Sequence, residues 1–180
     1  MNTAKRARLI LGCLLALVAP TAMAGEWSAV LNGRSMHLGA AEEWNENNLG
    51  LGVEYQFASE SRWKTILMAN GFRDSTKNMS YMAGAGLHRT LFDTHRLGDF
   101  YVDFGVNAFV MTREDVNDNR PFPGVLPSLT IGNRYGGINI AYLPVQAVEK
   151  FYETRMADDS ISGIVFVQFK VSVSQLFPTD

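Results

Sequence analysis

A histidine and an adjacent Asp-Ser pair are the residues of this sequence whose chemistry is easiest to name. His37 ends one segment of alternating apolar residues, and Asp74-Ser75 opens the polar stretch that follows another. A histidine can take a proton from a hydroxyl while a carboxylate orients its ring, so such a set can activate a hydroxyl for acyl transfer. Asp-Ser is also ordinary turn chemistry. The three residues therefore indicate a site only if the fold brings them together.

The first 24 residues have the pattern of an export signal. Three basic residues precede the apolar stretch 9–18, and Ala22-Met23-Ala24 forms a small-x-small cleavage site. The apolar stretch is too short to cross a bilayer as a helix, which takes about 20 residues. We expect residues 1–24 to be a signal peptide and residues 25–180 to form one mature domain.

Composition excludes several classes of protein. The chain of 180 residues is 47% hydrophobic, which is too apolar for a disordered protein. Its formal net charge of -2 argues against a nucleic-acid partner. The single cysteine, Cys13, lies in the expected signal, so the mature domain has neither a disulfide nor a thiol nucleophile. No His, Asp and Glu cluster has metal-ligand spacing and no glycine-rich phosphate loop occurs, so neither a metal nor another cofactor is expected.

The mature part of the chain alternates with the period of a β-strand. The clearest segment is 99–112, where one face is entirely apolar: Phe100, Val102, Phe104, Val106, Ala108 and Val110. Seven further strands are expected at about 27–38, 49–58, 63–73, 80–91, 124–133, 136–145 and 164–173. An exported chain with such strands is typical of an all-β, eight-stranded antiparallel transmembrane barrel with its apolar face outward. A soluble barrel of the lipocalin type, with its apolar face inward, is the alternative.

The lengths of the expected connections orient this barrel. Short turns of membrane barrels face the periplasm and long loops face the exterior. With both termini periplasmic, the external loops are 39–48, 74–80, 113–123 and 146–161, and the periplasmic turns are 59–62, 92–98 and 133–136. His37 and Asp74-Ser75 then lie together at the outer rim.

The lumen-facing side chains change character along the barrel axis. In six strands they are apolar and small in the outer half and polar in the inner half. Because glycine leaves the wall unfilled, we expect an apolar pocket for an acyl chain in the outer half of the lumen. Its expected lining is Gly50, Gly52, Met82, Gly84, Phe109, Met111, Leu126 and Phe166. The alternative is that these glycines relieve crowding or allow bends.

Charged residues face the inner half of the same lumen. They are Glu54, Lys64, Asp103 and Lys170, with His88 beside them. Unpaired buried charges are costly, so we expect these residues to form a paired polar plug below the pocket.

A series of short motifs extends over most of the mature chain. They are Met36-His37, Trp44-Asn45-Glu46, Gly50-Leu51-Gly52, Phe72-Arg73-Asp74-Ser75, Ala83-Gly84-Ala85-Gly86, Val125-Leu126-Pro127, Ile131-Gly132 and Ala141-Tyr142-Leu143-Pro144. In order and spacing these motifs resemble those of PagP-type lipid A palmitoyltransferases. The resemblance covers about residues 35–145 and the last strand.

The resemblance implies a monomeric enzyme in the outer membrane of a Gram-negative bacterium. Such an enzyme takes a palmitoyl chain from a phospholipid donor and places it on a hydroxyl of lipid A. In that family a histidine and an Asp-Ser pair at the outer rim are needed for activity, and they correspond to His37, Asp74 and Ser75. A glycine at the floor of the acyl-chain pocket corresponds to Gly86, and two prolines that flank lateral openings correspond to Pro127 and Pro144.

Four cations are candidates to contact the phosphates of lipid A. An arginine that follows the fifth strand in the family corresponds to Arg113, and Arg73, Lys77 and Arg120 lie on the same outer loops. The alternative is an ordinary solvated basic rim. Two features depart from the family: residues 25–26 leave no room for its N-terminal amphipathic helix, and residues 174–180 extend past the last strand.

In the mechanism that we expect, His37 is the general base for the acceptor hydroxyl and Asp74 orients it or stabilises its cationic form. Ser75 is either an acylated nucleophile or a hydrogen-bond donor to the ester carbonyl. Two other functions remain: a lipid A deacylase on the same fold, in which water replaces the acceptor, and a structural barrel of the OmpA or OmpX type without enzymatic activity.

Overall fold

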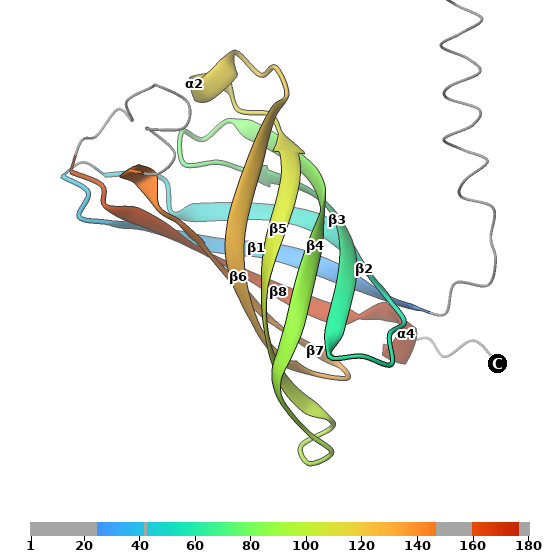
Figure 1. Cartoon of the computed structure of the whole chain (residues 1–180). Coiled ribbons are helices and arrows are strands. Elements are labelled where there is room, and N and C mark those ends of the chain that lie inside the picture. Colours follow the sequence, from blue (N-terminus) through green and yellow to red (C-terminus); the bar gives the residue numbers. More distant parts are fainter. Residues whose placement is uncertain (1–24, 42, 147–159, 177–180) are drawn as a thin grey trace, which may run out of the picture.

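The eight expected strands form a closed antiparallel barrel in the computed structural model, which describes residues 25–41, 43–146 and 160–176 (Figure 1). The strands are β1 (Gly25–Leu38), β2 (Asn47–Phe57), β3 (Trp63–Arg73), β4 (Met79–Thr94), β5 (Phe100–Met111), β6 (Phe122–Asn133), β7 (Gly136–Leu143) and β8 (Gly163–Ser172). Each strand pairs with the next, and β8 closes the barrel on β1. The predicted eight-stranded antiparallel barrel is thus confirmed. The expected signal peptide lies outside the described residues.

Two short helices mark the ends of the barrel. α2 (Glu114–Asn117) lies in the connection between β5 and β6, and α4 (Val173–Leu176) follows β8. The start of β1 and α4 lie at one end of the barrel, and α2 lies at the other (Figure 1). In the described part of the chain, no helix has the length and apolar character needed to cross a membrane.

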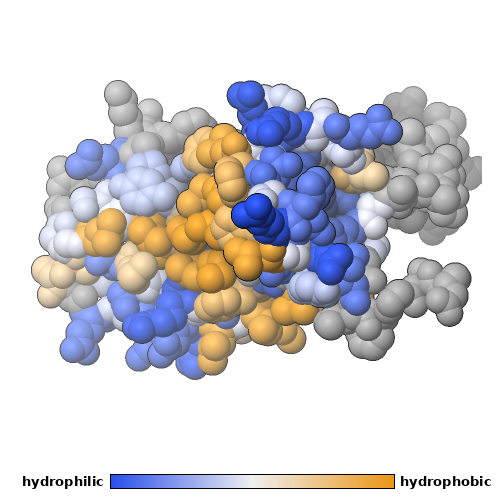
Figure 2. Space-filling model, turned by 90° about the horizontal axis from the view of Figure 1, so that it is seen from below, coloured by the Kyte–Doolittle hydropathy of each residue, from blue (hydrophilic) through white to orange (hydrophobic). Residues whose placement is uncertain are grey.

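Strand alternation separates two chemically different faces. The outward side chains include many exposed apolar residues, among them Leu31, Leu51, Val53, Leu67, Phe104 and Val125. Buried side chains are largely polar, and they include Asn32, Asn70, Ser128 and Thr130. Figure 2 shows hydrophobic residues gathered across the middle of the visible face, with hydrophilic residues on both sides. This arrangement is the reverse of a lipocalin-type barrel, which needs an apolar lumen and a polar exterior.

The inner half of the lumen contains paired polar groups. Lys170 Nζ lies 2.7 Å from Glu54 Oε1, and Lys64 Nζ lies 2.8 Å from Asp103 Oδ2. His88 Nε2 lies 2.9 Å from Asn107 Oδ1. Each expected charge therefore has an opposite charge within hydrogen-bond distance, and the predicted polar plug is confirmed.

Aromatic rings occupy the outer half of the lumen. Phe72 and Phe109 are buried, and the ring of Phe72 lies 5.5 Å from that of Phe166. Phe72 is not among the expected lining residues, because the expected lining comes from strands other than β3. The change from apolar to polar residues along the lumen is nevertheless as expected.

The glycines of β2 and β4 do not leave the wall open, which corrects the reason given for a pocket. A Cβ on Gly84 would come within 2.6 Å of the Phe109 backbone, and one on Gly50 within 2.5 Å of the Phe72 backbone. A Cβ on Gly86 would come within 2.8 Å of Ile66 Cγ1. Gly50 and Gly84 thus permit close approach of the neighbouring strands and Gly86 leaves room for side chains, in line with the alternative that these glycines relieve crowding. The pocket itself stays a prediction.

Candidate active site

A bulge in β1 determines the direction in which His37 points. Asn32 pairs with Gln168 and Ser35 pairs with Phe166, so between these positions β1 contains one residue more than β8. An extra residue reverses the alternation of all residues beyond it. Ser35 is consequently buried and Met36 exposed, and the His37 side chain is only 2% exposed. Without the bulge, His37 would point out of the barrel.

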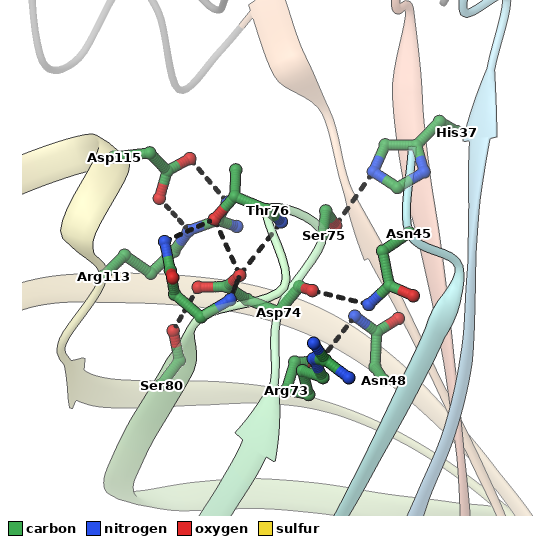
Figure 3. Close-up of polar contacts among 11 residues, drawn as sticks. His37, Asn45, Asn48, Arg73, Asp74, Ser75, Thr76, Ser80, Arg113 and Asp115 are labelled. Atoms are coloured by element: carbon green, nitrogen blue, oxygen red, sulfur yellow. Dashed lines mark hydrogen bonds and ion pairs between the residues drawn. The ribbon is translucent and has the colours of Figure 1, made fainter. Parts of the chain in front are cut away.

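His37 and Ser75 meet at the outer rim, as expected. His37 Nε2 lies 3.0 Å from Ser75 Oγ (Figure 3). The orientation of the His37 ring is set in part by Trp44. The two rings are stacked with their centroids 5.5 Å apart and an interplanar angle of 20°. The pair has the distance at which a histidine can accept the proton of a serine hydroxyl.

Asn45 joins the two segments that carry this pair. Its side-chain amide donates a hydrogen bond of 2.7 Å to the Asp74 carbonyl, and its backbone N–H donates one of 3.1 Å to the Ser75 carbonyl. The connection between β1 and β2 therefore holds the backbone of the turn that carries Ser75. Asn48 adds a third link, a hydrogen bond of 3.0 Å from its amide to the Arg73 carbonyl.

The Asp74 carboxylate forms its hydrogen bonds within its own turn and not with the His37 ring that it was expected to orient, while its expected effect on the cationic ring stays a prediction. Its Oδ1 accepts hydrogen bonds from the Thr76 N–H at 2.9 Å, the Thr76 hydroxyl at 2.8 Å and the Asn78 N–H at 3.0 Å. Its Oδ2 accepts one from the Ser80 hydroxyl at 2.8 Å (Figure 3). The carboxylate is buried and directed away from His37, so its contribution is to fix the backbone beside Ser75.

The pKa of Asp74 follows from this environment. Burial alone would raise the pKa, but the hydrogen bonds from Ser80 and Thr76, the charge of Arg113 and the hydrogen bond from Asn78 outweigh it. The pKa of the carboxyl therefore lies below its ordinary value of 3.8. Asp74 is therefore ionised at neutral pH.

The lowered pKa predicts that acid loosens the turn at 74–80. A depressed folded-state pKa stabilises the fold above the unfolded-state value, and this contribution is lost as the pH falls through the folded-state pKa. The amides of Thr76 and Asn78 should therefore be protected from hydrogen exchange at pH 6 and lose protection below pH 3.8. In Asp74→Asn both amides should exchange faster at pH 6, with little further change in acid. Equal protection of the wild-type amides at both pH values would contradict this prediction.

A second carboxylate, that of Glu46, lies beside His37 and was not among the expected site residues. Its Oε1 is 4.0 Å from His37 Nδ1 and accepts a hydrogen bond of 3.4 Å from the His37 backbone N–H. Its Oε2 is 3.1 Å from Arg34. The Trp44-Asn45-Glu46 motif was the signal in the sequence that could have identified it.

The four candidate cations have different surroundings. Arg113 forms two hydrogen bonds, of 2.9 and 2.7 Å, with the Asp115 carboxylate, and Arg73 Nε donates to the Lys77 carbonyl at 3.0 Å. Arg120 is exposed. Lys77 borders a cavity of about 580 Å³ together with His37. Lys77 is therefore the candidate that adjoins the His37–Ser75 pair.

The cavity beside His37 is polar and open to the exterior. Its lining includes Arg34, Glu43, Trp44, Asn47 and Lys77. Arg34 is a further cation that the sequence analysis missed, since it lies at the bulge. Among the described residues no group of three or more His, Cys, Asp and Glu side chains is arranged to hold a metal ion.

The two expected prolines lie near the outer end of the pairing between β6 and β7. The paired register of these strands runs from Asn133 with Gly136 to Ser128 with Ala141. Pro127 follows Ser128 toward the outer rim, and Pro144 follows the end of β7. Proline has no N–H to donate to a sheet ladder. The pairing between β6 and β7 therefore ends at Ser128, the residue next to Pro127.

Comparison with known proteins adds an independent finding. Residues 32–150 match the model of a family described as "PagP: Antimicrobial peptide resistance and lipid A acylation protein PagP". A protein of Methylobacillus flagellatus, named lipid A acyltransferase PagP, is 30% identical over 105 residues, which are 57% of this chain and 54% of that protein. A protein of the same name from Bordetella pertussis is 32% identical over 79 residues, 43% of this chain and 41% of that protein. The chain spans about half the length of the curated relatives it matches.

Proposed function

The chain belongs to the family of the lipid A acylation protein PagP, and from this premise we propose that it is a lipid A palmitoyltransferase of the outer membrane. It moves a palmitoyl chain from a phospholipid to a hydroxyl of lipid A in the outer leaflet. The observation that carries this proposal is the 3.0 Å contact between His37 Nε2 and Ser75 Oγ at the outer rim. Asp74 contributes by fixing the turn.

The exterior of the barrel supports a location in a membrane. Many apolar side chains are exposed, and on the face shown in Figure 2 they gather across the middle. Exposed aromatic residues lie toward the two ends of the barrel: Trp27, Trp63 and Tyr135 near the end with α4, and Tyr81 and Tyr142 near the end with His37. Outer-membrane barrels have an apolar band between two aromatic girdles.

The catalytic step needs a base for the acceptor hydroxyl and an acid for the leaving group. His37 takes the proton of the attacking hydroxyl, whose oxygen bonds to the ester carbonyl carbon. When the bond to the donor glycerol oxygen breaks, His37 returns a proton to that oxygen. Ser75 takes part either as the first nucleophile, which forms and then loses an acyl ester, or as a hydrogen-bond donor to the carbonyl oxygen.

The donor chain would enter between β6 and β7. The pairing of these strands ends at Ser128 and Ala141, on the outer side of which lies Pro127. Beyond this edge, the outer half of the lumen is lined by Phe72, Phe109 and Phe166. An acyl chain could lie along these rings or displace them. Its binding would be stabilised by about 0.8 kcal/mol for each CH₂ removed from water. Gly86, which adjoins His88 and Ile66, marks the level at which the apolar part ends.

The acceptor would bind in the polar cavity beside His37. The cavity has a volume of about 580 Å³ and offers Arg34 and Lys77 to phosphate groups. Its asparagine and tryptophan side chains suit the hydroxyls and faces of sugar rings. The two lipid substrates thus reach the His37–Ser75 pair from different sides.

Mass spectrometry of lipid A tests the proposed function. Cells of a Gram-negative host that lack their own lipid A palmitoyltransferase should gain a lipid A species heavier by one palmitoyl chain when this protein is expressed. Loss of an acyl chain instead would establish the deacylase alternative. Unchanged lipid A with folded protein in the outer membrane would establish a structural barrel and exclude the transferase.

A further inference from the structure

Among the described residues, Glu46 supplies a carboxylate within 4.0 Å of the His37 imidazole. Glu46 Oε1 lies 4.0 Å from His37 Nδ1 and also accepts the His37 backbone N–H at 3.4 Å. The carboxylate of Asp74, by contrast, accepts four hydrogen bonds from Thr76, Asn78 and Ser80. By its position, the Glu46 carboxylate rather than that of Asp74 can therefore orient the ring of a catalytic histidine.

Glu46 is held in place by β1. Arg34 lies 3.1 Å from its Oε2, and its backbone carbonyl accepts a hydrogen bond of 3.0 Å from the Ser35 N–H. With Oε2 turned to Arg34, Oε1 is the oxygen left to face His37. The bulge in β1 that turns His37 inward also leaves Arg34 exposed beside Glu46.

We propose that Glu46 is the positioning residue of the catalytic histidine. It holds the imidazole proton on Nδ1, which leaves Nε2 as the acceptor for the Ser75 hydroxyl at 3.0 Å. It also stabilises the cationic ring that forms when Nε2 takes the proton. The separation of 4.0 Å shortens to a hydrogen bond when substrate is bound, as is common for catalytic contacts in free enzymes. This inference rests on the proposed function for the identity of the reaction, but the tautomer is a property of the protein alone.

Other charged groups share the surroundings of His37. Arg34, Glu43 and Lys77 line the same cavity, and Asp74 lies on the adjoining turn. Glu60 is the suitable control because it is an exposed carboxylate in the connection between β2 and β3, outside the lining of this cavity. A general effect of removing one negative charge would appear in Glu60→Gln as well as in Glu46→Gln, whereas a positioning role belongs to Glu46 alone.

The test compares Glu46→Gln, Glu46→Ala and Glu60→Gln in vesicles that contain phospholipid and lipid A. We expect kcat to fall about 10- to 100-fold in both Glu46 variants with KM unchanged, a smaller loss than the roughly 10⁴-fold known for the buried aspartate of serine proteases. Glu60→Gln should keep the wild-type kcat. Glu46→Gln retains an oxygen for Arg34, which preserves the local fold.

Imidazole ¹⁵N NMR provides a readout that does not depend on activity. The chain has three histidines, so the His37 signals can be assigned by single substitutions. We expect the proton on Nδ1 in the wild type and a shift of the proton toward Nε2 in Glu46→Ala. An unchanged tautomer or an unchanged kcat in the folded Glu46 variants would overturn the proposal. If the wild type had no transferase activity, the proposed function would fail while the NMR result still decided the role of Glu46.

Discussion

Replacement of His37 by alanine should lower palmitoyl transfer about 10³- to 10⁴-fold, because a positioned acid–base group contributes about 10²- to 10⁴-fold to rate and this one serves both proton transfers. The barrel should remain folded, since His37 lies at the rim above the paired polar groups of the lumen. The measurement is the rate of palmitoyl transfer from phospholipid to lipid A in vesicles, together with the lipid A mass spectrum of cells.

His95→Ala is the matched control for this variant. The His95 side chain is fully exposed, in the turn between β4 and β5 at the opposite end of the barrel, and lies 3.2 Å from Asp99. Its loss should leave transfer unchanged. If His37→Ala kept even a tenth of the wild-type rate in folded protein, His37 would not be the base.

The fold could be predicted from the sequence because alternation acts over whole strands. The apolar row of 99–112 and the turn residues between segments indicated eight strands, and the structure has them. The polar plug followed from charge pairing, which depends only on which residues share the lumen. To predict these features, only the period of the apolar pattern and the direction of each strand are needed. The sequence provides both.

The candidate site depended on two local departures from regularity. Simple alternation places Arg34 and Met36 inward and His37 outward, and only the bulge after Asn32 reverses them. The position of the register shift depends on how β1 pairs with β2 and β8. The residues of β1 alone do not determine this pairing. Likewise, the carboxylate next to Ser75 in sequence was expected to orient His37, but hydrogen bonds within its own turn draw it away.

The glycines of β2 and β4 likewise show that the structure of the lumen wall could not be predicted from the sequence alone. A glycine in a strand fits both an open wall and a close approach of backbones, and the sequence does not distinguish them. The positions that a Cβ would occupy on Gly50 and Gly84 coincide with the neighbouring strands, so here the close approach applies. The lateral entry is supported differently, because the end of the β6–β7 pairing coincides with a proline that cannot donate to the ladder.

Removal of Lys170 should produce the largest loss of stability among single substitutions in the lumen. Lys170 and Glu54 are 8% and 5% exposed and lie 2.7 Å apart, and Asn139 donates a further hydrogen bond of 3.3 Å to Glu54. Lys170→Met leaves the Glu54 carboxylate buried without its cation, which typically costs about 3–5 kcal/mol. Urea unfolding of the protein in lipid vesicles, followed by tryptophan fluorescence, measures this cost.

The double variant Glu54→Gln/Lys170→Met separates the loss of an ion pair from the loss of packing. It removes both charges and keeps an oxygen for Asn139, so it should recover most of the stability that Lys170→Met loses. Arg62→Ala is the surface control, because Arg62 and Asp93 are 60% and 56% exposed and such pairs contribute about 0–1 kcal/mol. If Lys170→Met cost no more than Arg62→Ala, or the double variant were as unstable as the single one, the ion pair would not be what holds the inner half of the lumen together.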